Sequence, residues 1–71
     1  MHIDNLKALG MRIRFLRTTK KMSIEDLALE AGVNKNYLGD LERGMRNPTV
    51  KVLSKIANAL EVDLSNLFKG I

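Results

Sequence analysis

The apolar residues of this chain recur at helical spacing along its length, and glycine, proline and capping residues divide that pattern into short segments. Near the N-terminus the aliphatic side chains step by three or four residues: Leu6, Leu9, Ile13 and Leu16. This spacing predicts a first helix over about residues 4–19, with one apolar stripe facing a core. No segment alternates apolar and polar residues over a useful strand length, so the pattern predicts an all-α fold.

Capping and breaking residues predict where the later helices begin and end. Hydroxyl and amide side chains favour a helix start, while glycine favours a stop because it adopts positive φ without strain. The predicted N-caps are Ser23, Asn34 and Thr49, and the predicted stops are Gly32 and Gly44. A short fifth turn or helix is expected over about residues 63–68. The sequence thus predicts a compact bundle of five short helices, in a single domain over residues 1–71.

The composition excludes several classes of protein. The chain has no Cys and one His, His2, which rules out disulfides, Cys-based zinc sites and an imidazole pair for a metal. We therefore expect no catalytic residues, no metal and no cofactor. Apolar runs of three residues or fewer fit neither a signal sequence nor a membrane helix. A cytoplasmic protein that does not bind membranes is the resulting expectation.

The net charge of +4 is unevenly distributed. Residues 1–21 carry six basic groups against one acidic group, residues 22–31 carry only acidic ones, and residues 32–55 are basic again. This arrangement predicts a bipolar surface, with one side suited to a polyanion such as nucleic acid. The alternative is that the basic residues only keep helix surfaces soluble.

Residues 23–43 contain the most informative pattern. Two predicted helices join through a turn at Gly32, and the small side chain of Ala28 allows them to cross closely. Leu38 and Leu41 then fix the later helix to the core. This is the helix-turn-helix pattern, in which the second helix enters the DNA major groove. A pair of helices with no ligand is the competing interpretation.

Further motifs strengthen this interpretation. The chain reads L-E-R-G-M-R-N-P-T at residues 41–49 and I-A-N-A-L at residues 56–60. With these motifs, the segment from Leu9 to Phe68 resembles the lambda repressor/Cro (XRE-type) helix-turn-helix family. It is most similar to compact stand-alone members such as restriction–modification controller proteins. The resemblance implies a lambda-repressor-like DNA-binding bundle and a cytoplasmic repressor or other transcriptional regulator.

The resemblance also implies roles for individual residues. In this family the start of the third helix reads base edges, which here assigns Lys35, Asn36 and Asp40, with Tyr37 beside them. Their chemistry is suitable, because Lys donates to guanine, Asn pairs with adenine and Asp accepts from cytosine. The alternative is a solvated helix face. Gly39, within the same helix, allows close approach either to DNA or to the first helix.

Phosphate contacts are expected at helix starts and in the loop after the third helix. The candidates are Ser23, Asn34, Arg43, Arg46 and Asn47. Family members often have Gln at the position after Ser23, whereas this chain has Ile24. At the start of this helix we therefore expect a phosphate contact from the backbone only. The family pattern also pairs Arg17 with Glu42, which predicts a partly buried ion pair that positions the third helix.

The C-terminal segment, residues 61–71, is more apolar than a short cap requires. We therefore predict a dimer interface that includes Leu64, Phe68 and Ile71. A homodimer on a pseudo-palindromic operator would supply the contact area that one small monomer lacks. Alternatively, Leu67 and Phe68 only cover the core of the monomer. A second functional hypothesis is an antitoxin that binds DNA and a toxin protein.

Met11 and Met22 are expected in or beside the core.

Overall fold

The computed structural model describes the backbone of residues 3–71 and the side chains of residues 5–71, so His2 lies outside the described residues. The elements are α1 (Ile3–Thr19), α2 (Ile24–Ala31), α3 (Lys35–Glu42), α4 (Val50–Ala59) and the 3-10 helix η1 (Leu64–Phe68). Residues 3–71 contain no strand, which confirms the all-α prediction. The five predicted helices are therefore four α-helices and one 3-10 helix.

η1 is a 3-10 helix of five residues. Its hydrogen bonds run from the N–H of residue i+3 to the carbonyl of residue i, as from the Asn66 N–H to the Asp63 carbonyl at 2.9 Å. The loop before it turns at Glu61, which has a φ of 59°.

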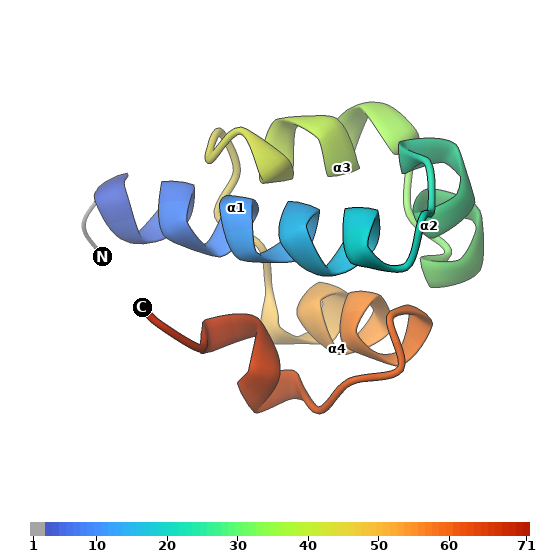
Figure 1. Cartoon of the computed structure of the whole chain (residues 1–71). Coiled ribbons are helices and arrows are strands. Elements are labelled where there is room, and N and C mark those ends of the chain that lie inside the picture. Colours follow the sequence, from blue (N-terminus) through green and yellow to red (C-terminus); the bar gives the residue numbers. More distant parts are fainter. Residues whose placement is uncertain (1–2) are drawn as a thin grey trace.

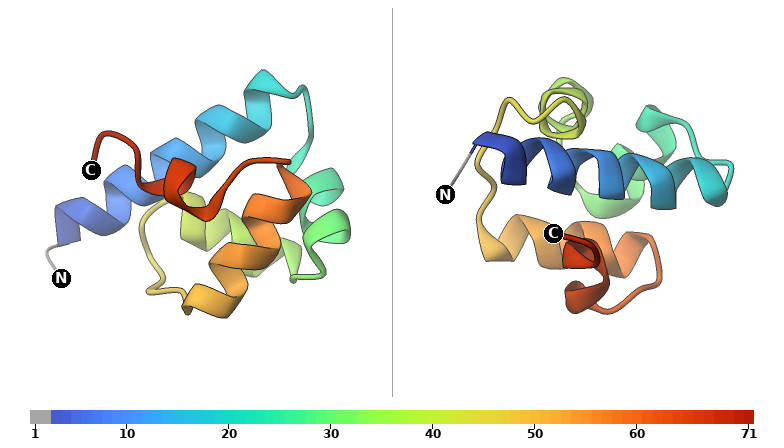
Figure 2. Two further views of the ribbon diagram at one scale, coloured as in Figure 1. Left: turned by 90° about the horizontal axis from the view of Figure 1, so that it is seen from below. Right: turned by 60° about the vertical axis from the view of Figure 1, so that its left-hand side comes forward.

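Helix α1 lies in the middle of the bundle, with α3 on one side and α4 and η1 on the other (Figures 1 and 2). It packs directly on α3 and on η1, while α2 packs on α3 and α4 at one end of the molecule. The α2–α3 pair therefore sits at the surface, supported from below by α1 and α4.

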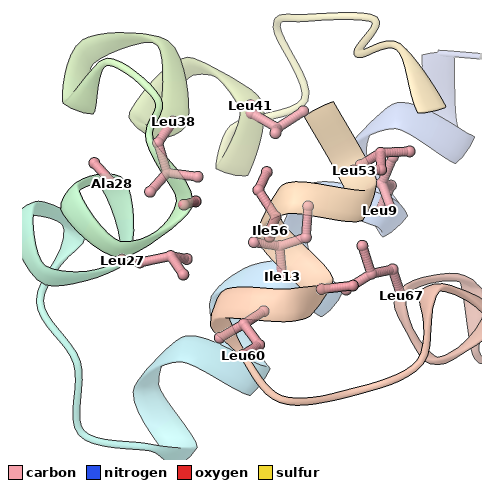
Figure 3. Packing of buried hydrophobic residues seen from close by; sticks show 12 residues of the cluster. Leu9, Ile13, Leu27, Ala28, Leu38, Leu41, Leu53, Ile56, Leu60 and Leu67 are labelled. Atoms are coloured by element: carbon pink, nitrogen blue, oxygen red, sulfur yellow. The ribbon is translucent and has the colours of Figure 1, made fainter. Parts of the chain in front are cut away.

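One hydrophobic core joins all five elements (Figure 3). The largest fully buried side chains are Ile13, Leu27, Leu38, Leu41, Ile56, Leu60 and Leu67. In α1 the predicted stripe is confirmed, since Leu9 is also buried and Leu16 packs against the core.

The two methionines that were predicted in or beside the core, Met11 and Met22, differ in their burial. Met22 packs against the core as predicted. The prediction for Met11 was wrong, because its side chain is 68% exposed. Met11 lies two residues from both Leu9 and Ile13, which places it about 200° around the helix from each of them.

Candidate nucleic-acid interface

The α2–turn–α3 pair is built from local capping interactions. The Ser23 hydroxyl accepts from the Asp26 N–H at 2.9 Å, and the Asp26 carboxylate accepts from the Ser23 N–H at 3.0 Å. This reciprocal capping box begins α2 and lowers the pKa of Asp26, chiefly through the backbone hydrogen bond. At the other end, Gly32 has a φ of 71° and donates to the Ala28 carbonyl. The chain thereby leaves α2 and reaches the cap of α3 within three residues.

Asn34 begins α3, because its side-chain oxygen accepts from the N–H groups of Asn36 at 2.7 Å and Tyr37 at 3.2 Å. The last α-helical residue is Glu42, and Arg43 is the C-cap. Gly44 follows with a φ of 77°, and a Cβ there would lie 2.8 Å from the Cα of Lys7. The positive φ and the close approach to α1 both require glycine at this position.

A buried ion pair fixes the C-terminal end of α3 to α1. Arg17 donates from Nε to one carboxylate oxygen of Glu42 at 2.7 Å and from Nη2 to the other at 2.9 Å. Its remaining Nη1 donates to the Met22 carbonyl at 2.8 Å. The hydrogen bond to Glu42 raises the pKa of Arg17 despite the opposing effect of burial. This pair joins the end of α1, the turn before α2 and the last turn of α3.

Gly10 is a second site of close contact between α1 and α3, and it was not identified from the sequence. A Cβ at this position would lie 2.5 Å from the Glu42 carbonyl oxygen and even closer to that of Leu41. The backbones of α1 and α3 therefore cross at Gly10. The available signal was a glycine inside a helical pattern, where it is unfavourable unless close packing requires it.

The outer face of α3 forms one wall of a groove of about 460 Å³, and the start of α2 forms the other. The lining residues are Ile24, Glu25, Lys35, Asn36, Gly39, Asp40 and Arg43. We call this the α2–α3 groove. It brings together three of the four predicted base readers, since Lys35 and Asn36 are exposed in it and Asp40 is half-buried. Tyr37 is half-buried and packs against the core.

Asp40 is engaged with two cations. Its carboxylate accepts from Arg43 Nη2 at 2.6 Å and lies 3.5 Å from Arg46 Nε. The Arg46 guanidinium in turn lies over the ring of Tyr37, 5.4 Å from its centroid. A carboxylate on a surface expected to meet a polyanion thus has its charge offset within the protein.

The predicted phosphate contacts separate into distinct positions. Ser23 and Asn34 are exposed helix caps, and Arg46 and Asn47 are exposed in the loop after α3. Arg43 and Arg46 both approach the Asp40 carboxylate, but of the two only Arg43 lines the α2–α3 groove. Gly39 also faces this groove: the nearest atoms to a Cβ there belong to Arg43 and Ile24, and none belongs to α1.

The C-terminal segment both closes the core and presents apolar surface. Leu64 packs against the core, whereas Phe68 is 39% exposed and Ile71 is 47% exposed. Arg12 holds this segment to α1, since its Nε donates to the Asn66 carbonyl at 3.0 Å and its Nη2 donates to the Asn66 side chain. No sequence signal distinguished Arg12 from the other basic residues of α1.

The described residues contain no cluster of three potential metal ligands among His, Cys, Asp and Glu side chains. None of the described helices is long and apolar enough to span a bilayer.

Known proteins share both the sequence pattern and the fold. A family model described as helix-turn-helix (HTH_3) matches residues 13–67. The transcriptional regulator SlrR of Bacillus subtilis is 48% identical over 61 residues, which cover 84% of this chain and 40% of that protein. The crystal structure of the restriction–modification controller protein C.AhdI from Aeromonas hydrophila is also similar, with a TM-score of 0.91. The two sequences are 40% identical, and the match covers 92% of this chain and 98% of that one.

A crystal structure of SinR, a master regulator for biofilm formation, in complex with DNA is also similar. It is 37% identical, with a TM-score of 0.82, and the match covers 86% of this chain and 98% of that one. The chain spans about half of the length of several curated relatives, from 40% of SlrR to 54% of SinR of Bacillus subtilis. Since the family model matches more than half of the chain and the α2–turn–α3 geometry agrees with it, the chain belongs to the helix-turn-helix family.

Proposed function

We propose that this protein is a transcriptional regulator that binds double-stranded DNA in a sequence-specific manner, with α3 in the major groove. The observation that carries the proposal is the exposed start of α3. Lys35 and Asn36 extend from it into the α2–α3 groove, while the opposite face of the helix is fixed to the core by Leu38 and Leu41. A rigidly held helix with polar side chains on its free face is what base readout requires.

The positions of the remaining polar groups support this orientation. Arg46 and Asn47 lie in the loop just beyond α3, and the capped starts of α2 and α3 add backbone N–H groups. Groups of this kind bind phosphates and set the register of a protein on the duplex. Lys35 and Asn36, in contrast, would contact the base edges and so determine which DNA sequence is bound. The similarity to SinR, whose structure includes DNA, agrees with this proposal.

We further propose that two copies bind a pseudo-palindromic operator. One copy has a total accessible surface of 4596 Å². Specific protein–DNA interfaces bury roughly 1,000–2,500 Å² of protein surface, so a single small domain reaches this range with difficulty. The exposed Phe68 and Ile71, with the half-buried Leu64 beside them, supply an apolar surface for pairing at the C-terminal segment.

Selection from a random pool of duplexes tests the proposal. We expect enrichment of a site with two-fold symmetry, and affinity for the selected duplex that falls steeply with salt concentration. Recovery of unrelated sequences, together with weak binding that disappears at physiological salt, would contradict sequence-specific regulation.

A second candidate is a module whose main partner is another protein, such as a toxin. It is favoured by large apolar side chains that are exposed outside the C-terminal segment, among them Met11 at 68% and Phe15 at 57%. A structure of SinR with the protein SinI shows that a similar chain forms such a complex. Stoichiometric co-purification of a second protein, together with failure of the duplex selection, would favour this candidate.

A further inference from the structure

The side chain of Arg43 turns back along the outer surface of α3 instead of extending into the following loop. Its Nη2 donates to the Asp40 carboxylate at 2.6 Å. The guanidinium passes close to residue 39, because a Cβ there would be in ordinary van der Waals contact with it, 3.5 Å from Nη1 and 3.8 Å from Nη2 of Arg43. The guanidinium therefore lies over the bare backbone of Gly39, beside the side chain of Ile24.

This position places the guanidinium among the base-reading candidates. Arg43 lines the α2–α3 groove together with Lys35 and Asn36, whereas Arg46 does not line it. Arg43 keeps 62% of its side-chain surface exposed, so the groove leaves it accessible to a ligand.

The charges of the groove favour a base edge over a phosphate. Glu25 and Asp40 bring two carboxylates to its walls, beside the cations of Lys35 and Arg43. These two carboxylates offset the two cations, so the groove has little net charge with which to attract a phosphate. The edge of a base pair carries no net charge, and guanine presents two acceptors, O6 and N7, in the major groove.

We propose that Arg43 contacts guanine through O6 and N7 in the major groove, and that Asp40 is the positioning residue that aims it. A guanidinium has five N–H donors in a planar fork, so the bond to Asp40 leaves a pair of donors for the two guanine acceptors. This inference rests on the proposed function and names a ligand for one residue of that interface. It replaces both the phosphate contact expected of Arg43 and the direct base contact expected of Asp40.

The test compares Arg43→Ala with Arg46→Ala, which removes a neighbouring cation from outside the groove. Wild type first selects its duplex from a random pool. Binding of each protein is then measured on that duplex, and on copies in which each base pair is changed in turn, at several salt concentrations. Both side chains are more than half exposed, so the variants should melt at the wild-type temperature.

Arg43→Ala is expected to lose preference at one G·C pair in each half-site, with discrimination there reduced about 10- to 100-fold. Because the lost contact is not to a phosphate, the salt dependence should stay close to that of wild type. Arg46→Ala should weaken binding to all duplexes alike and make the salt dependence shallower.

Asp40→Asn keeps the shape of the side chain and removes its charge. It should reduce discrimination at the same G·C pair, because Arg43 is no longer held over Gly39. It should also strengthen binding to unrelated duplexes, because a released arginine can reach phosphates. These two changes in opposite directions are not expected of a residue that only stabilises the fold.

The outcomes separate the two proposals. If wild type selects no site, sequence-specific binding fails, and the inference about Arg43 fails with it. If wild type selects a site but Arg43→Ala weakens all duplexes equally and lowers the salt dependence, then Arg43 contacts phosphate and only the inference is wrong. If Asp40→Asn leaves discrimination at every pair unchanged, Asp40 does not position Arg43.

Discussion

The guanidinium of Arg17 holds the carboxylate of Glu42 through two parallel hydrogen bonds, from Nε at 2.7 Å and from Nη2 at 2.9 Å. Both side chains are almost inaccessible, with exposed fractions of 11% and 5%. The orientation of α3 therefore depends on a polar contact that water screens little. Removing either partner would leave the other charge buried without compensation.

We accordingly expect Arg17→Ala to destabilise the fold by about 3–5 kcal/mol. Urea unfolding followed by circular dichroism measures this loss. Arg14→Ala is the matched control, because Arg14 is an exposed arginine on the same helix and its loss should change stability by less than about 0.5 kcal/mol. Equal effects of the two substitutions would show that the buried pair contributes no more than a surface charge. The double variant Arg17→Met with Glu42→Leu should recover part of the loss, since no unpaired charge remains.

The two glycines within helices should respond to alanine in opposite directions. At Gly10 a new Cβ would meet backbone carbonyls of α3 at 2.5 Å or less, and backbone cannot rotate away. Gly10→Ala should therefore cost about 1–3 kcal/mol, as overpacking does. At Gly39 the nearest atoms are 3.5 Å away or more, so Gly39→Ala should gain about 0.5–1 kcal/mol from helix propensity.

Thermal melting of the two glycine variants beside wild type checks the prediction. A stabilised Gly10→Ala variant would mean that α1 and α3 do not cross at this point. A destabilised Gly39→Ala variant would mean that the space over residue 39 is smaller than the structure shows.

The proposed interface predicts two classes of DNA-binding variant. Lys35→Ala or Asn36→Ala should cost about 1–3 kcal/mol on the selected duplex and relax base preference at single positions. Arg46→Ala should instead lower affinity on every sequence and reduce the slope of log affinity against log salt by about one. Fluorescence anisotropy with selected and scrambled duplexes measures both effects. Equal loss on both duplexes for all three variants would contradict the assignment of α3 as the reading helix.

The cap of α2 predicts a dependence on pH. The hydrogen bonds with Ser23 lower the pKa of Asp26, so the capping box stabilises the fold above the pKa of the unfolded carboxyl. That stabilisation is lost as the pH falls through the lower pKa of the folded state. In an NMR titration, Ser23→Ala should raise the pKa of Asp26 towards its ordinary value. A pKa that does not change would show that the capping box is not formed in solution.

Local interactions explain why much of the fold was predictable from sequence. Ser23, Asn34 and Thr49 cap the helices that they were predicted to cap, because each side chain bonds to N–H groups two or three residues away. Such bonds depend on neighbouring residues in the chain, which a sequence displays directly.

The remaining features depend on contacts between distant segments. The crossing at Gly10 requires α3 to pass over α1, and no pattern within either helix shows which turn will be in contact. The path of Arg43 depends on a rotamer that is held by its hydrogen bond to Asp40. The sequence placed Arg43 near the interface but did not show the direction of its side chain.

The proposed homodimer predicts that exposed apolar residues of the C-terminal segment control assembly. Phe68→Ser and Ile71→Ser, made together, should shift the protein from dimer to monomer in sedimentation velocity at micromolar concentration, because pairing would otherwise bury both side chains. Leu64 is unsuitable for this test, since it also packs against the core of the monomer. Val50→Ser is the matched control, because Val50 is 65% exposed at the start of α4, outside the C-terminal segment. The monomeric variant should retain the wild-type melting temperature at low concentration and bind single half-sites without cooperativity. If the paired substitution leaves the sedimentation coefficient unchanged while wild type is dimeric, the two copies meet through another surface.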